Sequence, residues 1–283
     1  MKLNSLPLFM LRNLQRLDVS VNFSINEPLN IWGLPQLKNL TLRGTISLVP
    51  PRSVHHNLES IRLLDYRSCT DELFMRIPNL KTLGVDEGRK INLKCKAFSW
   101  FENLAYLYKL EDLHVCEKLL HPEFSTIHSM GTWSVEIFLP NLKKLKLFNT
   151  KLNWKNMYVV GMLPKLEVLI LRSAGVGRKW KPKDGGFLGL KFLCIESCDL
   201  QIWKATGGHF PILECLVMCM DYFEKIPSGF ADIATLKSIK LHECSKSAIS
   251  SAKCIQEEQR EYGNNAFTVD ILRYDDFVDY FWY

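Results

Sequence analysis

The sequence predicts an α/β solenoid shaped like a horseshoe, with parallel strands on its concave face and loops and short helices on its convex face. Two observations predict this fold. A pattern of leucines occurs ten times, at intervals of 21–24 residues with two longer intervals of 30 and 32. Each copy also contains two hydrophobic residues separated by one residue, the spacing of a strand with one buried side. Because one such strand cannot bury its apolar row alone, the copies stack and share a core.

The repeated pattern is L-x-x-L-x-L-x-x-N/C, which defines the leucine-rich repeat. The first leucines of the ten copies are Leu14, Leu37, Leu58, Leu80, Leu110, Leu142, Leu166, Leu190, Leu213 and Leu236. In the third copy the pattern assigns Ile61 and Leu63 to the buried side of the strand. The residue at the asparagine position turns the chain out of the strand, and Cys198 and Cys244 occupy it in later copies. The long intervals, near 86–108 and 116–138, are expected to bulge outward.

The C-terminal part differs from the repeats. Residues 245–263 read as a helix that Ser245 or Ser247 can cap and Gly263 can end. Its apolar side is predicted to consist of Ala248, Ile249, Ala252, Ile255 and Tyr262. A last strand follows at 267–271. We therefore expect a repeat solenoid over 1–244 and a cap with a tail over 245–283.

No comparable cap is predicted before the first repeat, since only 13 residues precede Leu14. An uncapped hydrophobic end is a liability for a solenoid. The sequence therefore suggests the tail of a longer protein, or a truncated descendant of one.

Composition limits the class of protein. The chain has 283 residues, 47% of them hydrophobic and 23% charged, which is typical of globular proteins. Its longest apolar runs fall far short of the ~20 residues that span a bilayer, and no signal peptide is evident. Nine cysteines, an odd number, favour reduced thiols in the cytoplasm. Peripheral attachment to membranes stays open, and a net charge of +6 does not require a nucleic-acid partner.

The sequence contains no recognisable catalytic motif. No glycine is followed by lysine, as a Walker A loop requires, and no nucleophile elbow, zinc helix or dinucleotide fingerprint occurs. We therefore expect no enzyme activity, no catalytic residue, no cofactor and no metal. The pairs Cys194/Cys198 and Cys215/Cys219 are too divergent on the repeat to converge on zinc. His114 and Cys116 share one strand face, but no third group that would orient a nucleophilic pair is identifiable.

Residues 177–183 combine four basic residues with Trp180 and could contact phosphates or anionic lipid. Because the net charge is small and the run is confined to one loop, a solvated loop is the favoured interpretation.

A partner-binding surface is predicted on the outward side of the strands. From the sixth repeat to the ninth the outward residues become apolar, with basic neighbours, and form a patch of a few hundred Å². The candidate residues are Lys144, Lys146, Phe148, Val168, Ile170, Arg172, Phe192, Cys194 and Val217. The lysines and the arginine would steer an acidic protein partner. In the alternative, a long loop such as 117–138 covers these positions.

Three segments carry a resemblance to a known family: LPNLKKLKLFNTKLNWKNMYVVGMLPKLEVLIL, GGFLGLKFLCIESCDLQIWKATGGHFPILECLVM and the tail SAKCIQEEQREYGN. They resemble the leucine-rich repeats of plant intracellular immune receptors with a coiled coil and a nucleotide-binding domain, the late blight resistance proteins. The similarity is strong over 142–271 and looser over 14–141.

The resemblance implies a module that recognises pathogens and restrains its receptor, whose activation causes defence and localised cell death. The implied partners are a pathogen effector, a host guard protein or the receptor's own nucleotide-binding module. The coiled coil and the P-loop of the family are not found in these 283 residues, so ATP binding is not carried over to them. The alternative is a stand-alone cytosolic repeat scaffold or a substrate adaptor.

Overall fold

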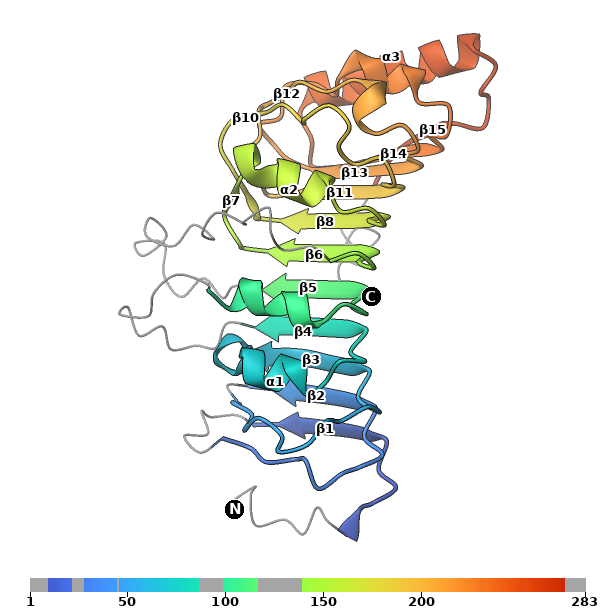
Figure 1. Cartoon of the computed structure of the whole chain (residues 1–283). Helices are drawn as coiled ribbons and strands as arrows, with labels where there is room; N and C mark the ends of the chain where they lie inside the picture. The colour runs from blue at the N-terminus through green and yellow to red at the C-terminus, as the bar shows by residue number, and fades with distance from the viewer. Residues whose placement is uncertain (1–9, 22–27, 45, 87–98, 117–138, 273–283) are drawn as a thin grey trace, which may run out of the picture. The chain divides into compact units, whose positions relative to one another are not determined.

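The computed structural model describes residues 10–21, 28–44, 46–86, 99–116 and 139–272. The chain divides into two compact units, Met1–Leu142 and Lys143–Tyr283. In each unit one short strand per repeat pairs in parallel with the strand of the next repeat (Figure 1). This stacking of one strand per repeat confirms the predicted α/β leucine-rich repeat solenoid.

The described residues of the first unit form five paired strands. They are β1 (Arg16–Ser20), β2 (Asn39–Arg43), β3 (Ser60–Asp65), β4 (Thr82–Asp86) and β5 (Asp112–Cys116). Its helical segments are η3 (Tyr66–Ser68), α1 (Asp71–Met75) and η4 (Ser99–Tyr106). The five-residue helix α1 begins at Thr70, whose hydroxyl accepts a hydrogen bond from the Leu73 amide. The connections therefore consist of short helices and loops, as the repeat length predicts.

In the second unit, the described residues 143–272 form a sheet of six strands. They are β6 (Lys144–Phe148), β8 (Val168–Arg172), β11 (Phe192–Glu196), β13 (Cys215–Cys219), β14 (Ser238–His242) and β15 (Thr268–Ile271). Two small pairs lie outside this sheet, β7 (Leu152–Asn153) with β9 (Gly175–Val176) and β10 (Lys179–Trp180) with β12 (Ile202–Trp203). The helical segments are η6 (Trp154–Asn156), α2 (Met157–Gly161), η7 (Gly207–His209), η8 (Ser228–Asp232) and α3 (Lys246–Glu261).

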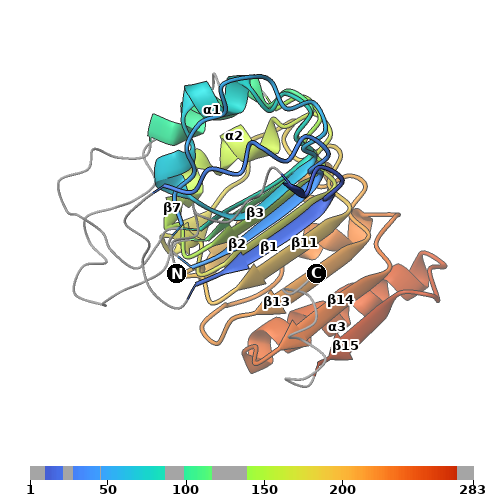
Figure 2. The same ribbon diagram turned by 90° about the horizontal axis from the view of Figure 1, so that it is seen from below.

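Each strand has an inward and an outward side. In β8 the inward residues Leu169 and Leu171 are fully buried, and Leu193 and Ile195 repeat this in β11. In the second unit α2 lies on the inward side of the sheet, as Figure 2 shows, whereas α3 packs against η8 and β15 at the end of the repeats. We call the opposite side of the six-stranded sheet the open face. The two-residue spacing of the motif therefore separates core residues from residues available for binding.

Strand β3 departs from the predicted register. Leu64, and not Leu63, is the buried residue after Ile61. The pairing of β3 with β4 shifts between Ile61 and Leu64, and Leu63 adopts a φ of 60°. This is a β-bulge, in which one extra residue displaces the alternation. The motif L-x-x-L-x-L contains no signal for that insertion, so the assignment of Leu63 to the core is wrong.

Trp180 belongs to the core and not to a solvated loop. Its side chain is 1% exposed and stacks between Trp154 and Trp203, with ring centroids 4.9 and 5.1 Å apart. The segment that contains it forms β10, in which Lys179 stays exposed. The predicted basic and aromatic loop is thus a short strand whose aromatic side chain is unavailable to lipid or nucleic acid.

Helix α3 follows the prediction at both ends but not along its whole apolar side. The Ser245 hydroxyl accepts a hydrogen bond from the Ala248 amide, and Gly263 has a φ of 90° just beyond the last turn. Tyr262 is exposed, however, whereas Gln259 is 2% exposed. The spacing of apolar residues could not predict the burial of Gln259, because this polar side chain is held inside by hydrogen bonds.

Gln259 connects α3 to the preceding repeat. Its side-chain amide donates hydrogen bonds to the carbonyls of Ala231 at 2.6 Å and Ile233 at 3.1 Å. We expect Gln259→Leu to lower the free energy of unfolding by about 1–3 kcal/mol, because it leaves two buried carbonyls without this donor. Urea denaturation followed by circular dichroism measures the change. Glu257→Leu, at an exposed position of the same helix, is the control, and equal stability of both variants would contradict the assignment.

Candidate partner-binding face

The nine candidate residues all lie on the open face of the second unit, on four neighbouring strands. The strand register aligns them in three rows. Ile170 lies opposite Lys146 on one side and Cys194 on the other, and Cys194 lies opposite Val217. Val168 is likewise aligned with Lys144 and Phe192, and Arg172 with Phe148. The register predicted from the sequence is therefore the register of the structure.

The exposure of this face differs from the prediction of an open patch. Ile170, Cys194 and Val217, which form the middle row, are 3%, 0% and 0% exposed. We call these three residues the central cluster. The neighbouring candidates Val168 and Phe192 are half-buried. Lys146, in the same row, is also buried at 6% exposure, so only the two outer rows of the patch keep partial exposure to solvent. The sequence pattern gives the side of the strand but not what packs over it.

Leu272 contacts the central cluster and was missed by the sequence analysis. It directly follows β15, which pairs with β14. The Leu272 amide donates to the Leu241 carbonyl at 2.8 Å, and its own carbonyl lies 3.0 Å from Nδ1 of His242. Ile271 lies opposite the inward residue Leu241, so alternation along β15 places the next residue, Leu272, on the open face. Extending the predicted strand by one residue would have found it. The covering loop considered in the sequence analysis, 117–138, lies outside the described residues.

Charged residues flank the central cluster. Lys146 and Lys240 lie on either side of the cluster in the middle row, and Asp270 of β15 lies beyond, opposite Lys240. In the next row, Nε of Arg172 lies 3.3 Å from a carboxylate oxygen of Glu196. Burial raises the pKa of the Glu196 carboxyl, and nearby Arg172 and His242 partly oppose that shift. The face therefore combines an apolar centre with a charged margin in which lysines and an arginine outnumber the acidic groups Glu196 and Asp270, which favours an acidic and apolar ligand.

The thiols on this face are not poised for nucleophilic chemistry. Burial is the main cause that raises the pKa of Cys194 well above its usual range and the pKa of Cys219 to about 12. Burial also raises the pKa of the Cys215 thiol. At neutral pH these side chains are thiols and act as small apolar groups.

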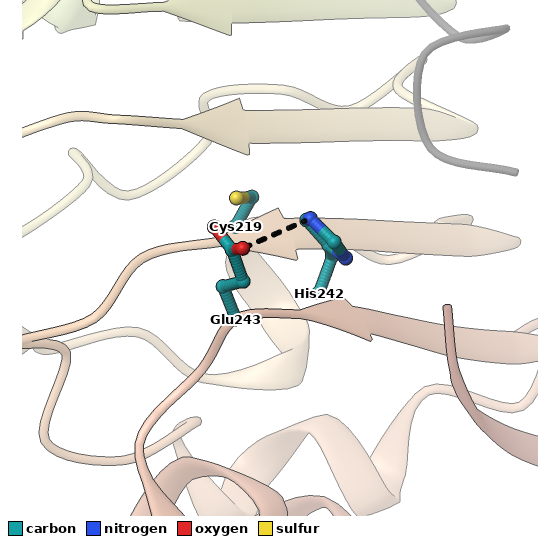
Figure 3. Close-up of side chains that lie close together, drawn as sticks. All are labelled: Cys219, His242 and Glu243. Atoms are coloured by element: carbon teal, nitrogen blue, oxygen red, sulfur yellow. Dashed lines mark ion pairs between the residues drawn. The ribbon is translucent and has the colours of Figure 1, made fainter. Parts of the chain in front are cut away.

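Cys219, His242 and Glu243 come together at the ends of β13 and β14 (Figure 3). Their ligand atoms lie within 4.8 Å of one another, and Nε2 of His242 is 3.7 Å from a Glu243 carboxylate oxygen. Zinc requires the sulfur as a thiolate. The raised pKa of Cys219 opposes this form, so the three groups as they stand make a polar cluster around an ion pair.

The two cysteine pairs of the sequence do not form one cluster of four. Cys194, Cys215 and Cys219 lie on the open face, whereas Cys198 lies beyond the end of β11. There its thiol donates to the Glu196 carbonyl and accepts a hydrogen bond from the Gly175 amide. This position at the turn out of the strand is the one that the repeat predicts.

His114 and Cys116 belong to the first unit. They occupy alternate positions of β5, on the side opposite the buried Leu113 and Val115. The two residues share one face of β5, as predicted. They do not belong to the candidate face, because all nine candidate residues lie in the second unit.

Comparison with known proteins shows which proteins this chain is similar to in sequence. No protein-family model matches it. Late blight resistance protein R1-A from Solanum demissum is 33% identical over 261 residues, which cover 87% of this chain and 19% of that protein. The putative homologue R1B-13 from the same species is 32% identical over 244 residues, which cover 84% of this chain and 21% of that protein. The chain is a homologue of the late blight resistance proteins.

This late blight resistance homologue spans about a fifth of the length of the relatives that it matches, 19% for R1-A. A shorter match to the putative homologue R1B-11 reaches 43% identity over 110 residues. Among solved structures, a leucine-rich repeat protein of Leptospira interrogans matches with 14% identity and a TM-score of 0.27, over 93% of this chain and 91% of that one. None of the described helices is long and apolar enough to cross a membrane.

Proposed function

We propose that the chain is the protein-binding leucine-rich repeat module of a plant disease-resistance receptor, and that it acts in pathogen recognition and receptor autoinhibition. Its homology to late blight resistance proteins and its repeat fold support this proposal. In this proposal it binds protein, in the cytoplasm, and catalyses no reaction. The partner is a pathogen effector, a host guard protein or the receptor's own nucleotide-binding module.

The observation that carries the proposal is the open face of the second unit. Val168 and Phe192 lie side by side on β8 and β11 and are half-buried, so part of each side chain is available to a ligand. Lys144 lies next to Val168 on β6. An apolar centre with a charged margin is the usual arrangement of a protein interface.

The nucleotide-binding module of R1-A, produced separately, is a suitable probe for the autoinhibitory contact. We expect the double variant Val168→Glu, Phe192→Glu to weaken its binding at least tenfold, because two carboxylates would lie beside the apolar cluster and be desolvated on binding. Biolayer interferometry measures the dissociation constant, and circular dichroism checks that the fold is retained.

The matched control is Leu188→Glu with Ile202→Glu. Both residues are exposed hydrophobics of the same unit, and neither belongs to the six-stranded sheet. The control is expected to bind like the unmodified chain. If the Val168 and Phe192 variant folds and binds as tightly as this control, the module docks elsewhere. If neither the unmodified chain nor any variant binds the module, the proposal that this chain takes part in autoinhibition is wrong.

A further inference from the structure

The burial of the central cluster needs an explanation, because it lies on the face of the sheet opposite the helices. A strand side chain on a sheet face without a second layer normally remains accessible to water. Ile170, Cys194 and Val217 are nevertheless at most 3% exposed. Of the described hydrophobic residues packed against them, five lie on the strands β6, β8, β11 and β13, and Leu272 alone comes from another segment.

Leu272 fixes the place where the following segment starts. Its backbone is held by the Leu241 carbonyl and by His242, both at the end of β14. The next eleven residues, 273–283, read RYDDFVDYFWY and lie outside the described part of the chain. Leu272, the last described residue, lies next to the central cluster, so the segment begins there.

The composition of residues 273–283 complements the open face. The segment contains six aromatic residues and three aspartates, Asp275, Asp276 and Asp279. The face presents an apolar centre with Lys146 on one side and Lys240 on the other, the latter opposite Asp270 of β15. Aromatic side chains supply large apolar area to such a centre, and the aspartates match the basic margin.

The length of the segment also fits. Four strand intervals separate β14 from β6, a distance of about 19 Å at ~4.8 Å per interval. Eleven extended residues reach up to about 36 Å. The segment is therefore long enough to cross the open face. Asp279, the seventh residue after Leu272, can reach about 23 Å and so extends to the lysines of β6, whereas Asp275 and Asp276 reach about 10–13 Å and stay nearer to Lys240 on β14.

We propose that residues 273–283 dock on the open face of their own unit and cover the central cluster. This inference rests on the proposed function, because it assigns a regulator to the same site: the segment is an intramolecular ligand that must leave before a protein partner binds. Tail and partner then compete for Val168, Phe192 and the central cluster.

Cys194 provides a direct measurement, since it lies at the centre of the cluster. The full chain and a variant ending at Leu272 are treated with the same excess of iodoacetamide, and each cysteine is followed by peptide mass spectrometry. We expect Cys194 to react about tenfold faster without the segment, because its local opening no longer requires the segment to leave. Equal rates at Cys194 in two folded proteins would overturn the proposal.

Other cysteines report on folding in the same experiment. Cys254 is exposed on α3 and Cys69 is buried in the first unit, so both rates should stay unchanged. Cys198 is partly exposed beyond the end of β11, away from the open face, so its rate should not depend on the segment. An equal rise at Cys198 and Cys194 therefore counts against specific covering.

A second variant keeps the full length. Asp275→Lys with Asp276→Lys removes the charge match and should accelerate the labelling of Cys194 several-fold. Glu257→Lys with Glu261→Lys makes the same change of charge at exposed positions of α3 and should not. A synthetic peptide of residues 273–283, added to the chain that ends at Leu272, should slow the labelling of Cys194 again. A peptide of the same composition in scrambled order should have no such effect, and equal protection by both peptides would contradict a specific docking site.

The two proposals fail separately. If the segment protects Cys194 but the shortened chain does not bind the nucleotide-binding module of R1-A, the tail docks and the proposed autoinhibitory contact is wrong. If the module binds the full and the shortened chain equally, and Cys194 reacts equally in both, the partner site stands and the docking of the tail is wrong.

Discussion

Trp180→Ala is expected to lower the free energy of unfolding by about 3–5 kcal/mol, the usual cost of removing a fully buried large aromatic side chain. Trp180 stacks on Trp154 and Trp203, and its ring edge contacts Phe187 and Phe210. Its removal leaves a cavity in which four aromatic rings from consecutive repeats lose a neighbour. Urea denaturation of the full chain, followed by tryptophan fluorescence and circular dichroism, measures the loss.

Tyr222→Ala is the control for this substitution, because Tyr222 is 82% exposed. It should change the free energy of unfolding by less than about 0.5 kcal/mol. If Trp180→Ala were as mild as this control, Trp180 would lie outside the core, and the interpretation of 177–183 as a solvated loop would be restored.

A chain that ends at Cys244 is expected to aggregate. It lacks α3, which packs against η8 and supplies the Gln259 amide to two backbone carbonyls. It also lacks β15, so β14 becomes an unpaired edge beside newly uncovered apolar residues such as Phe230 and Leu236. Exposed strand edges promote association between chains. Size-exclusion chromatography with light scattering detects the resulting oligomers.

The chain that ends at Leu272 is the matched control, because it keeps α3 and β15. We expect it to remain largely monomeric at the same concentration. A monomeric chain ending at Cys244, with the melting temperature of the full chain, would show that residues 245–283 do not cap the solenoid.

The repeat pattern predicts the inward side of the sheet well, because that side depends on local alternation. Leu169, Leu171, Leu193 and Ile195 are buried as the motif requires. The β-bulge at Leu63 escaped prediction, since either leucine of the pair Leu63 and Leu64 satisfies a hydrophobic pattern. Only pairing with β4 distinguishes them.

Contacts between residues distant in sequence were not predictable in the same way. The stacking of Trp154, Trp180 and Trp203 joins positions 26 and 23 residues apart. Gln259 was overlooked because a buried amide has no hydrophobic signature. For the candidate site, the sequence predicts which residues of neighbouring strands lie side by side, because the repeat pattern aligns equivalent positions of successive strands. It does not predict that the central cluster is covered, because Leu272 belongs to no repeat.

The pairing of each strand with the strand of the next repeat has a consequence for how this protein folds. In the second unit, partners such as β11 and β13 are joined by fewer than 25 residues, so closing each contact requires only a short loop. Order can spread from one folded repeat to its neighbour, and no single distant contact must form first. Unfolding should correspondingly begin at the ends of a unit and proceed repeat by repeat. Amide hydrogen exchange would then be slowest in the strands with folded neighbours on both sides and faster toward the terminal repeats.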